Sequence, residues 1–226
     1  MSTVTAVAPS TRGRSLLQVG FWSAVAMATF YTAWDLGFVA SFFLKWPANL
    51  IASWVPSVFV PAAWIALMVS INRWAEEDKR IFSETAIAFG IVYAALSTSV
   101  YFLQLTVALP KEIAGNGSQV GILLWEQPRS FPYAMDILGY TFMSLSALFA
   151  AFAFGRRGFP RWIRWSLLVA GLPAFVLPIQ MFWLPAEIAA APTLFAFPAA
   201  GVLLALLFAR ERAEMSSRIG SSIARR

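Results

Sequence analysis

The chain has 226 residues, of which 59% are hydrophobic and only 12% are charged. A soluble domain carries about 25% charged residues, so this composition excludes a soluble enzyme and a nucleic-acid-binding domain as the main interpretation. The sequence contains no Cys and no His, which excludes disulfides, thiol chemistry and imidazole metal sites. We therefore expect no cofactor and no nucleic-acid partner. The composition is typical of an all-α, polytopic membrane protein whose first partner is the lipid bilayer.

Six segments are long and apolar enough to cross a membrane, because a hydrocarbon core of about 30 Å needs roughly 20 apolar residues in helical form. In chain order the predicted spans are Leu16–Leu44, Val55–Asn72, Glu84–Leu109, Pro132–Phe154, Trp162–Leu184 and Ile188–Ala209. We expect a bundle of six transmembrane helices over residues 15–210. A disordered cytoplasmic segment at 1–14 and a basic cytoplasmic tail at 211–226 are predicted to flank it.

The positive charges predict the orientation of this bundle. With the N-terminus inside, 14 of the 17 Lys and Arg residues fall on the cytoplasmic side, and only Lys45, Lys111 and Arg129 fall outside. Basic residues stay on the cytoplasmic side during insertion. The sequence therefore predicts a multi-pass protein of the cell membrane (inner or plasma membrane) with both termini in the cytoplasm. Orientation and contact with anionic lipid also explain the basic charge.

Two features predict departures from a simple bundle. The outer connection at 110–131 is long, and its apolar stretch Val120–Trp125 is too short to span, so we expect it to lie at the interface or re-enter and cover the outer face. Prolines interrupt the spans, and broken helices at membrane depth often line a cavity. These prolines are Pro56 and Pro61 at the start of the second span, Pro173 and Pro178 in the fifth, and Pro192 and Pro198 in the sixth.

Polar side chains inside the spans gather in the outer half. Asp35 and Asp136 are the two acids away from a cytoplasmic end, and a carboxylate at the bilayer centre costs about 2.5–3.5 kcal/mol on insertion scales. A Tyr lies four residues from each acid and one turn deeper, where its phenol can donate to the carboxylate. With the two amides of these spans, the predicted ligand-binding set is Tyr31, Asp35, Tyr101, Gln104, Asp136, Tyr140 and Gln180.

Each of these residues also has a structural explanation. Asp136 lies in the first turn of its predicted helix, where the helix dipole favours a negative charge. The glutamines are typical of hydrogen bonds between membrane helices, and the tyrosines of packing. Asp35 is the hardest to explain in this way, because it lies mid-segment among apolar neighbours, and an acid inside a span is by default a functional hypothesis.

Three functions compete. The first is the binding or transport of a small molecule or cation through an outer-half site with Asp35 and Asp136. The second is a non-catalytic accessory subunit that packs against a membrane protein partner or a second copy of itself, for which the Gly20-x3-Ala24 pattern offers a close-packing face. The third is an intramembrane enzyme in which the two aspartates activate water. We favour the first and lean against an enzyme, because neither aspartate carries the flanking residues of intramembrane aspartyl proteases.

Overall fold

A computed structural model describes residues 11–125 and 130–223. Within these ranges the chain forms seven α-helices and no strand. Six helical segments are long and apolar enough to cross a membrane: Gly13–Ser41, Ala48–Trp74, Glu77–Ile113, Phe131–Ala151, Pro160–Met181 and Thr193–Arg218. The predicted all-helical class is confirmed, and the six helices are compatible with an integral membrane protein. Most of the segment expected to be disordered lies outside the described residues, and the first helix begins at Thr11.

The seven helices are α1 (Thr11–Ser41), α2 (Ala48–Trp74), α3 (Arg80–Leu103), α4 (Leu109–Ile113), α5 (Phe131–Ala151), α6 (Pro160–Gly171) and α7 (Thr193–Ile223). Each predicted span contains one long helix or one series of helical turns, but the observed boundaries differ from the predicted ones. The second helix begins at Ala48, so Pro56 and Pro61 lie inside it and not at its start. Each proline removes only one backbone hydrogen bond, which a helix packed among neighbours tolerates.

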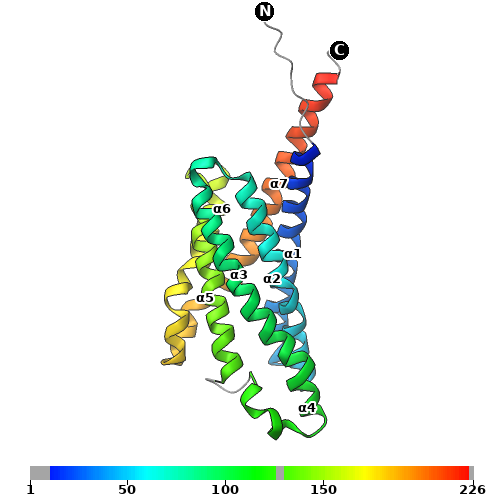
Figure 1. Cartoon of the computed structure of the whole chain (residues 1–226), viewed down its shortest axis with the longest axis vertical. Coiled ribbons are helices and arrows are strands. Elements are labelled where there is room, and N and C mark those ends of the chain that lie inside the picture. The colour runs from blue at the N-terminus through cyan, green and yellow to red at the C-terminus, as the bar shows by residue number, and fades with distance from the viewer. Residues whose placement is uncertain (1–10, 126–129, 224–226) are drawn as a thin grey trace, which may run out of the picture.

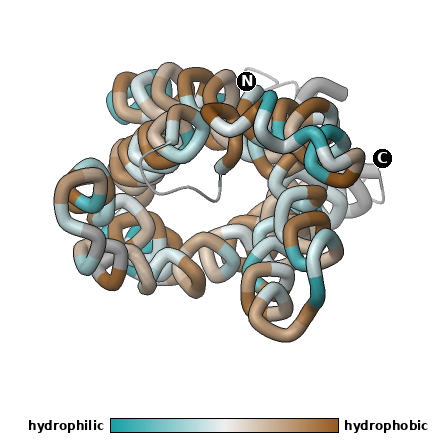
Figure 2. Tube along the Cα trace, turned by 90° about the horizontal axis from the view of Figure 1, so that it is seen from below, coloured by the Kyte–Doolittle hydropathy of each residue, from teal (hydrophilic) through white to brown (hydrophobic). Residues whose placement is uncertain are grey.

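Helices that follow one another along the chain pack side by side, and the last one closes on the first. α1 contacts α2, α2 contacts α3, α3 contacts α5, α5 contacts α6, α6 contacts α7, and α7 returns against α1. Figure 2, which looks along the long axis, shows this ring of helices. In Figure 1 the start of α1 and the end of α7 lie together, far from α4. We call the end with Thr11 and Ile223 the termini end, and the end with α4 the loop end.

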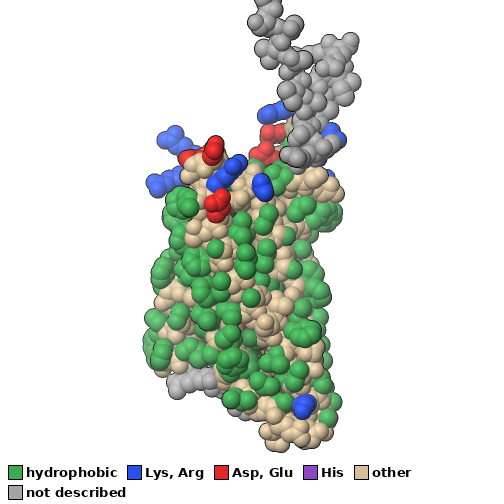
Figure 3. Space-filling model, in the orientation of Figure 1, with side chains coloured by type: hydrophobic (Ala, Val, Ile, Leu, Met, Phe, Trp, Pro, Cys, Tyr) green, Lys and Arg blue, Asp and Glu red, His purple; other side chains and the backbone are tan. Residues whose placement is uncertain are grey.

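Charged side chains are concentrated at one end of the ring. On the face drawn in Figure 3, Lys, Arg, Asp and Glu gather at the termini end, whereas the sides are covered by hydrophobic side chains. The exposed apolar residues on these sides include Trp22, Phe59 and Val202. A belt of exposed apolar side chains between polar ends is the surface that a bilayer requires.

Small residues and one buried Trp hold the termini-end half together. A Cβ atom on Gly20 would lie 2.8 Å from the Phe208 ring, so only Gly lets α1 and α7 approach this closely. The fully buried Trp64 of α2 donates from Nε1 to the Ser146 hydroxyl of α5 (3.0 Å). Ser146 in turn donates to the Ala86 carbonyl of α3 (2.7 Å), so one chain of hydrogen bonds ties three helices.

The fifth and sixth spans are interrupted at the loop end. α6 ends at Gly171, and 3-10 turns follow over Leu172–Phe175, Leu177–Met181 and Leu184–Ala190. α7 begins only at Thr193, directly after Pro192, and it continues to Ile223, well past the predicted end at Ala209. The interruption expected from the prolines of the fifth span is therefore present, and it replaces one wall of the ring by tight turns.

Candidate functional site

A cavity of about 410 Å³ lies in the loop-end half of the ring. Its walls come from α1, α5, the 3-10 turns at Leu177–Met181 and Leu184–Ala190, and the start of α7. Seven aromatic side chains line it: Tyr31, Trp34, Phe38, Trp125, Tyr133, Tyr140 and Phe197. The polar lining residues are Asp136, Ser144, Gln180 and Thr193. Among the described lining residues Asp136 is the one acid, and we call this pocket the aromatic chamber.

Helical spacing explains how the two main walls form. Tyr31, Trp34 and Phe38 are three and four residues apart on α1, so they share one face. Asp136 and Tyr140 repeat this spacing on α5. The two walls meet where Trp34 stacks on Tyr140, with ring centroids 5.7 Å apart. This contact joins α1 to α5 across the ring and fixes the width of the chamber.

Asp136 is buried, with 2% of its surface exposed, and only one of its oxygens has partners. Oδ2 accepts hydrogen bonds from the Tyr101 hydroxyl (3.0 Å) and from the Trp125 indole Nε1 (3.1 Å). Oδ1 is buried and accepts no hydrogen bond from any described residue. Within residues 11–125 and 130–223, no Lys or Arg forms an ion pair with this carboxylate. A buried carboxylate in this condition is complementary to a cation or a strong donor.

A cluster of tyrosines surrounds the same carboxylate. The hydroxyls of Tyr101 and Tyr140 lie 3.3 Å apart, and the Tyr93 ring packs against Tyr140 with centroids 5.9 Å apart. Tyr93 and Tyr101 belong to α3, whereas Tyr140 belongs to α5. Tyr101 therefore orients Asp136 from the neighbouring helix α3, and Tyr140 links this contact to the chamber wall.

Gln104 fastens the long connection over this site. Its side chain is fully buried; Nε2 donates to the Leu123 carbonyl (2.6 Å), and Oε1 accepts from the Trp125 backbone N–H (3.2 Å). Gln104 also begins a single π-helical turn, Gln104–Ala108, a distortion often found at functional sites. The segment expected to cover the outer face forms a 3-10 turn at Gly117–Leu123 and then places Trp125 in the chamber wall.

The seven predicted site residues fall into three groups. Four line the chamber: Tyr31, Asp136, Tyr140 and Gln180. Tyr101 and Gln104 are buried behind it and hold Asp136 and Trp125 in place.

Asp35 forms the third group, because it is not among the residues that line the chamber. It is half-buried, and its Oδ1 accepts no hydrogen bond from a described residue. It lies one turn beyond Tyr31 on the same helix. A single site containing both acids stays a prediction.

Sequence reasoning missed most of the aromatic wall. Trp34 and Phe38 share the helical stripe of Tyr31, so spacing alone could have identified them. Trp125 fits the interfacial position of many membrane tryptophans, and nothing in its local sequence indicates that its indole reaches Asp136. Phe197 comes from α7 and meets Tyr31 (centroids 5.0 Å apart) only through the closure of the ring.

The described residues contain no group of three or more acids that could hold a metal ion. Comparisons with known protein families, with curated proteins and with solved structures find no match to this chain. We therefore infer the chemistry of the chamber from its described lining residues: the Asp136 carboxylate with one unpartnered oxygen, Gln180 and the aromatic rings.

Proposed function

We propose that this chain is an integral membrane protein that binds a small organic cation, an amine or a quaternary ammonium compound, in the aromatic chamber. The observation that carries the proposal is the Asp136 carboxylate, which lines the chamber, is buried and leaves Oδ1 without a partner among the described residues. An acid inside a membrane span is costly, and a bound cation would offset this cost. Asp136 would supply the counter-charge.

The aromatic walls support the same ligand class. A cation within about 6 Å of the face of Trp or Tyr gains about 0.5–2 kcal/mol, and cages of several rings are typical of quaternary ammonium sites. Trp34, Tyr140 and Trp125 line the same chamber as Asp136, and Trp125 donates a hydrogen bond to it. The volume of about 410 Å³ lies within the range of roughly 300–1,000 Å³ that small-molecule sites occupy.

We further propose that the termini end faces the cytoplasm and that the chamber lies in the outer half of the cell membrane. The support is the distribution of charge, since Lys and Arg gather at the termini end (Figure 3), and basic residues are retained on the cytoplasmic side. A ligand would then reach Asp136 from the outer side, past the segment that Gln104 fastens.

The test is a binding titration of the full chain in lipid nanodiscs. The probe is phenyltrimethylammonium, and its uncharged isostere tert-butylbenzene is the ligand control. We expect the cation to bind, and the isostere to bind about 10- to 100-fold more weakly, because a charge-assisted contact contributes about 1.5–3 kcal/mol. Quenching of tryptophan fluorescence reports binding, since Trp34 and Trp125 line the chamber.

Two variants with the same change of charge assign the site. Asp136→Asn is expected to lower the affinity for phenyltrimethylammonium by about 10- to 100-fold. Asp35→Asn, outside the chamber lining, is expected to change it less than about threefold. Equal affinity for the cation and its isostere, or an unchanged affinity in Asp136→Asn, would contradict the proposal.

Transport is a second candidate function, and the broken wall of the chamber favours it. The 3-10 turns between Leu172 and Ala190 replace a continuous helix beside Asp136, and discontinuous helices form the binding sites of several transporter folds. Uptake of radiolabelled phenyltrimethylammonium into proteoliposomes tests it, with Asp136→Asn as the inactive control. Binding without uptake would restrict the function to binding.

The accessory-subunit and enzyme alternatives remain predictions. The enzyme alternative needs both acids on one reacting atom, whereas the chamber is lined by Asp136 without Asp35. The accessory alternative predicts one stoichiometric membrane partner that co-purifies with the full chain. Finding such a partner, together with a chamber that binds no cation, would favour that alternative over the cation site.

A further inference from the structure

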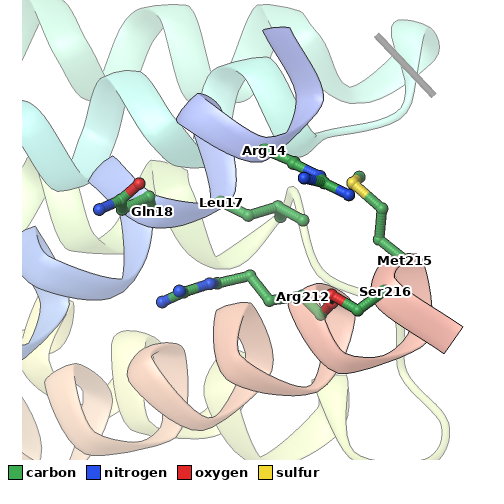
Figure 4. A pocket seen from close by; sticks show the side chains of 6 residues that line it. All are labelled: Arg14, Leu17, Gln18, Arg212, Met215 and Ser216. Carbon is green, nitrogen blue, oxygen red and sulfur yellow. Dashed lines mark hydrogen bonds between the residues drawn. The ribbon is translucent and has the colours of Figure 1, made fainter. Parts of the chain in front are cut away.

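A second groove lies at the termini end, between the first turns of α1 and the last turns of α7. Its volume is about 240 Å³, and it is lined by Arg14, Leu17, Gln18, Arg212, Met215 and Ser216 (Figure 4). None of these residues lines the aromatic chamber. An inference about this groove is therefore independent of the proposed cation site.

The polar side chains of the groove form two matching pairs. Arg14 and Gln18 are one turn apart on α1, and Arg212 and Ser216 are one turn apart on α7, so each helix presents a guanidinium and a neutral polar group. Figure 4 shows the two guanidinium groups toward opposite ends of the groove, with Leu17 between them. The groove thus offers several donors to an elongated anion.

The two guanidinium groups have no acid beside them in the described part of the chain. Neither Arg14 nor Arg212 forms an ion pair there. The acids of this part of α7, Glu211 and Glu214, line a neighbouring groove that shares Met215 with this one, and there Glu214 lies 3.9 Å from Arg218. The residues that line the groove itself include two arginines and no acid, which favours an anionic ligand.

The surroundings of the groove indicate that the anion carries apolar chains. The Arg212 guanidinium lies 5.6 Å from the centre of the Phe21 ring, where the polar end of the molecule meets its apolar sides. Farther along the same two helices, the exposed side chains include Val19 and Trp22 on α1 and Leu206 on α7. A free anion would use only the arginines, whereas a lipid would also cover these apolar side chains.

We propose that the groove between α1 and α7 binds the phosphate-bearing headgroup of an anionic phospholipid. One guanidinium binds the phosphate oxygens, which it matches with two parallel hydrogen bonds, and the other, at the opposite end of the groove, donates to oxygens farther along the headgroup. Gln18 and Ser216 donate to the remaining headgroup oxygens. The acyl chains follow the apolar sides of α1 and α7 into the membrane.

The experiment titrates the detergent-solubilised full chain with fluorescent phosphatidylglycerol, with phosphatidylcholine as the neutral lipid. The groove variant is Arg14→Gln/Arg212→Gln. The control Arg156→Gln/Arg157→Gln removes the same charge from an exposed connection at the same end of the molecule. We expect the groove variant to bind phosphatidylglycerol about tenfold more weakly, and the control to change by less than about twofold. Phosphatidylcholine is expected to bind equally weakly to all three proteins.

Three results would overturn the proposal. An unchanged affinity in the groove variant would remove the arginines from the site. An equal loss in both variants would show a general attraction between charges and no built groove. Complete displacement of the labelled lipid by millimolar inorganic phosphate would identify free phosphate as the ligand.

A second variant keeps the proposal testable if the double substitution fails to fold. Arg212→Lys retains the charge but loses the paired guanidinium donors, so we expect an affinity about threefold weaker. An affinity equal to that of the unsubstituted protein would again contradict a built headgroup site. Thermal unfolding of each variant confirms that the comparison is made on folded protein.

Discussion

The termini-end and loop-end halves of the molecule are built from the same helices but treat polar side chains in opposite ways. In the termini-end half, the Trp64 indole, the Ser146 hydroxyl and the Ala86 carbonyl satisfy one another within a packed interior. In the loop-end half, Asp136 lies beside a cavity with Oδ1 unpartnered among the described residues. Satisfied polar groups specify packing, whereas an unsatisfied group beside a cavity indicates a ligand.

The backbone follows the same division. α1, α2 and α7 are continuous through the termini-end half. In the loop-end half, the continuation of α3 passes through a π-helical turn at Gln104–Ala108, and α6 gives way to 3-10 turns after Gly171. Such distortions cost hydrogen bonds inside a membrane unless the freed groups line a cavity or find partners. The irregular half is therefore the one in which we place the cation site.

The largest expected effect is all-or-none and concerns which side of the membrane each half faces. Ser118→Cys places a single thiol at the loop end, and Arg157→Cys places one at the termini end, in a chain without native Cys. We expect a membrane-impermeant maleimide to label the Ser118→Cys protein in intact cells. It should label the Arg157→Cys protein only after the cells are permeabilised, because basic residues stay on the cytoplasmic side. The reverse pattern would place the chamber in the cytoplasmic half.

The next largest effect should come from Trp64→Ala, which removes a large buried side chain from the packed termini-end half. Trp64 is fully buried, and its ring meets the Phe197 ring with centroids 5.5 Å apart. We expect the free energy of unfolding to fall by about 3–5 kcal/mol, because the substitution leaves a large cavity and removes the donor to the Ser146 hydroxyl. Unfolding in mixed micelles measures it. The exposed Trp22→Ala is the control. An equal loss of stability in this variant would contradict the tight packing of Trp64 in the termini-end half.

The general architecture could be predicted from the sequence, because span length, proline positions and charge are local properties. The interruption after Gly171 follows from Pro173 and Pro178, whereas Pro56, Pro61 and Pro198 lie inside continuous helices. The extension of α7 to Ile223 did not follow from hydropathy, since the polar residues after Ala209 are mostly good helix formers that continue a helix outside the apolar region.

The candidate site could be predicted only in part, because spacing gives the face of a helix but not its neighbour. Tyr31 and Tyr140 were identified by their spacing from the acids, and both line the chamber. Gln104 was predicted to bind the ligand, yet its side chain forms hydrogen bonds with the backbone at Leu123 and Trp125 and does not line the chamber. The path of the long connection depends on these tertiary hydrogen bonds, which no local pattern encodes.

A smaller effect is expected from Tyr101→Phe, which removes one of the two donors to Asp136. We expect the free energy of unfolding, without ligand, to fall by about 1.5–3 kcal/mol, the usual contribution of a hydrogen bond to a charged group. The control Tyr93→Phe removes a hydroxyl from the same helix without removing a donor to Asp136. If both variants lose the same stability, the tyrosines contribute packing and do not orient the acid.

The smallest effect is expected from Gln104→Leu, and it should be local. The substitution removes both hydrogen bonds that fasten the segment before Trp125, at a cost of about 1 kcal/mol per bond, partly offset because water can reach a released loop. We expect backbone amides at 123–125 to exchange with deuterium about tenfold faster, while the amides of α2 keep their rates. Gln119→Leu, in the 3-10 turn Gly117–Leu123, removes only an exposed hydrogen bond from Lys111 (3.2 Å) and should leave exchange at 123–125 unchanged. Faster exchange throughout the molecule would mean that Gln104 stabilises the whole ring, and the loop-end half would then be no looser than the other.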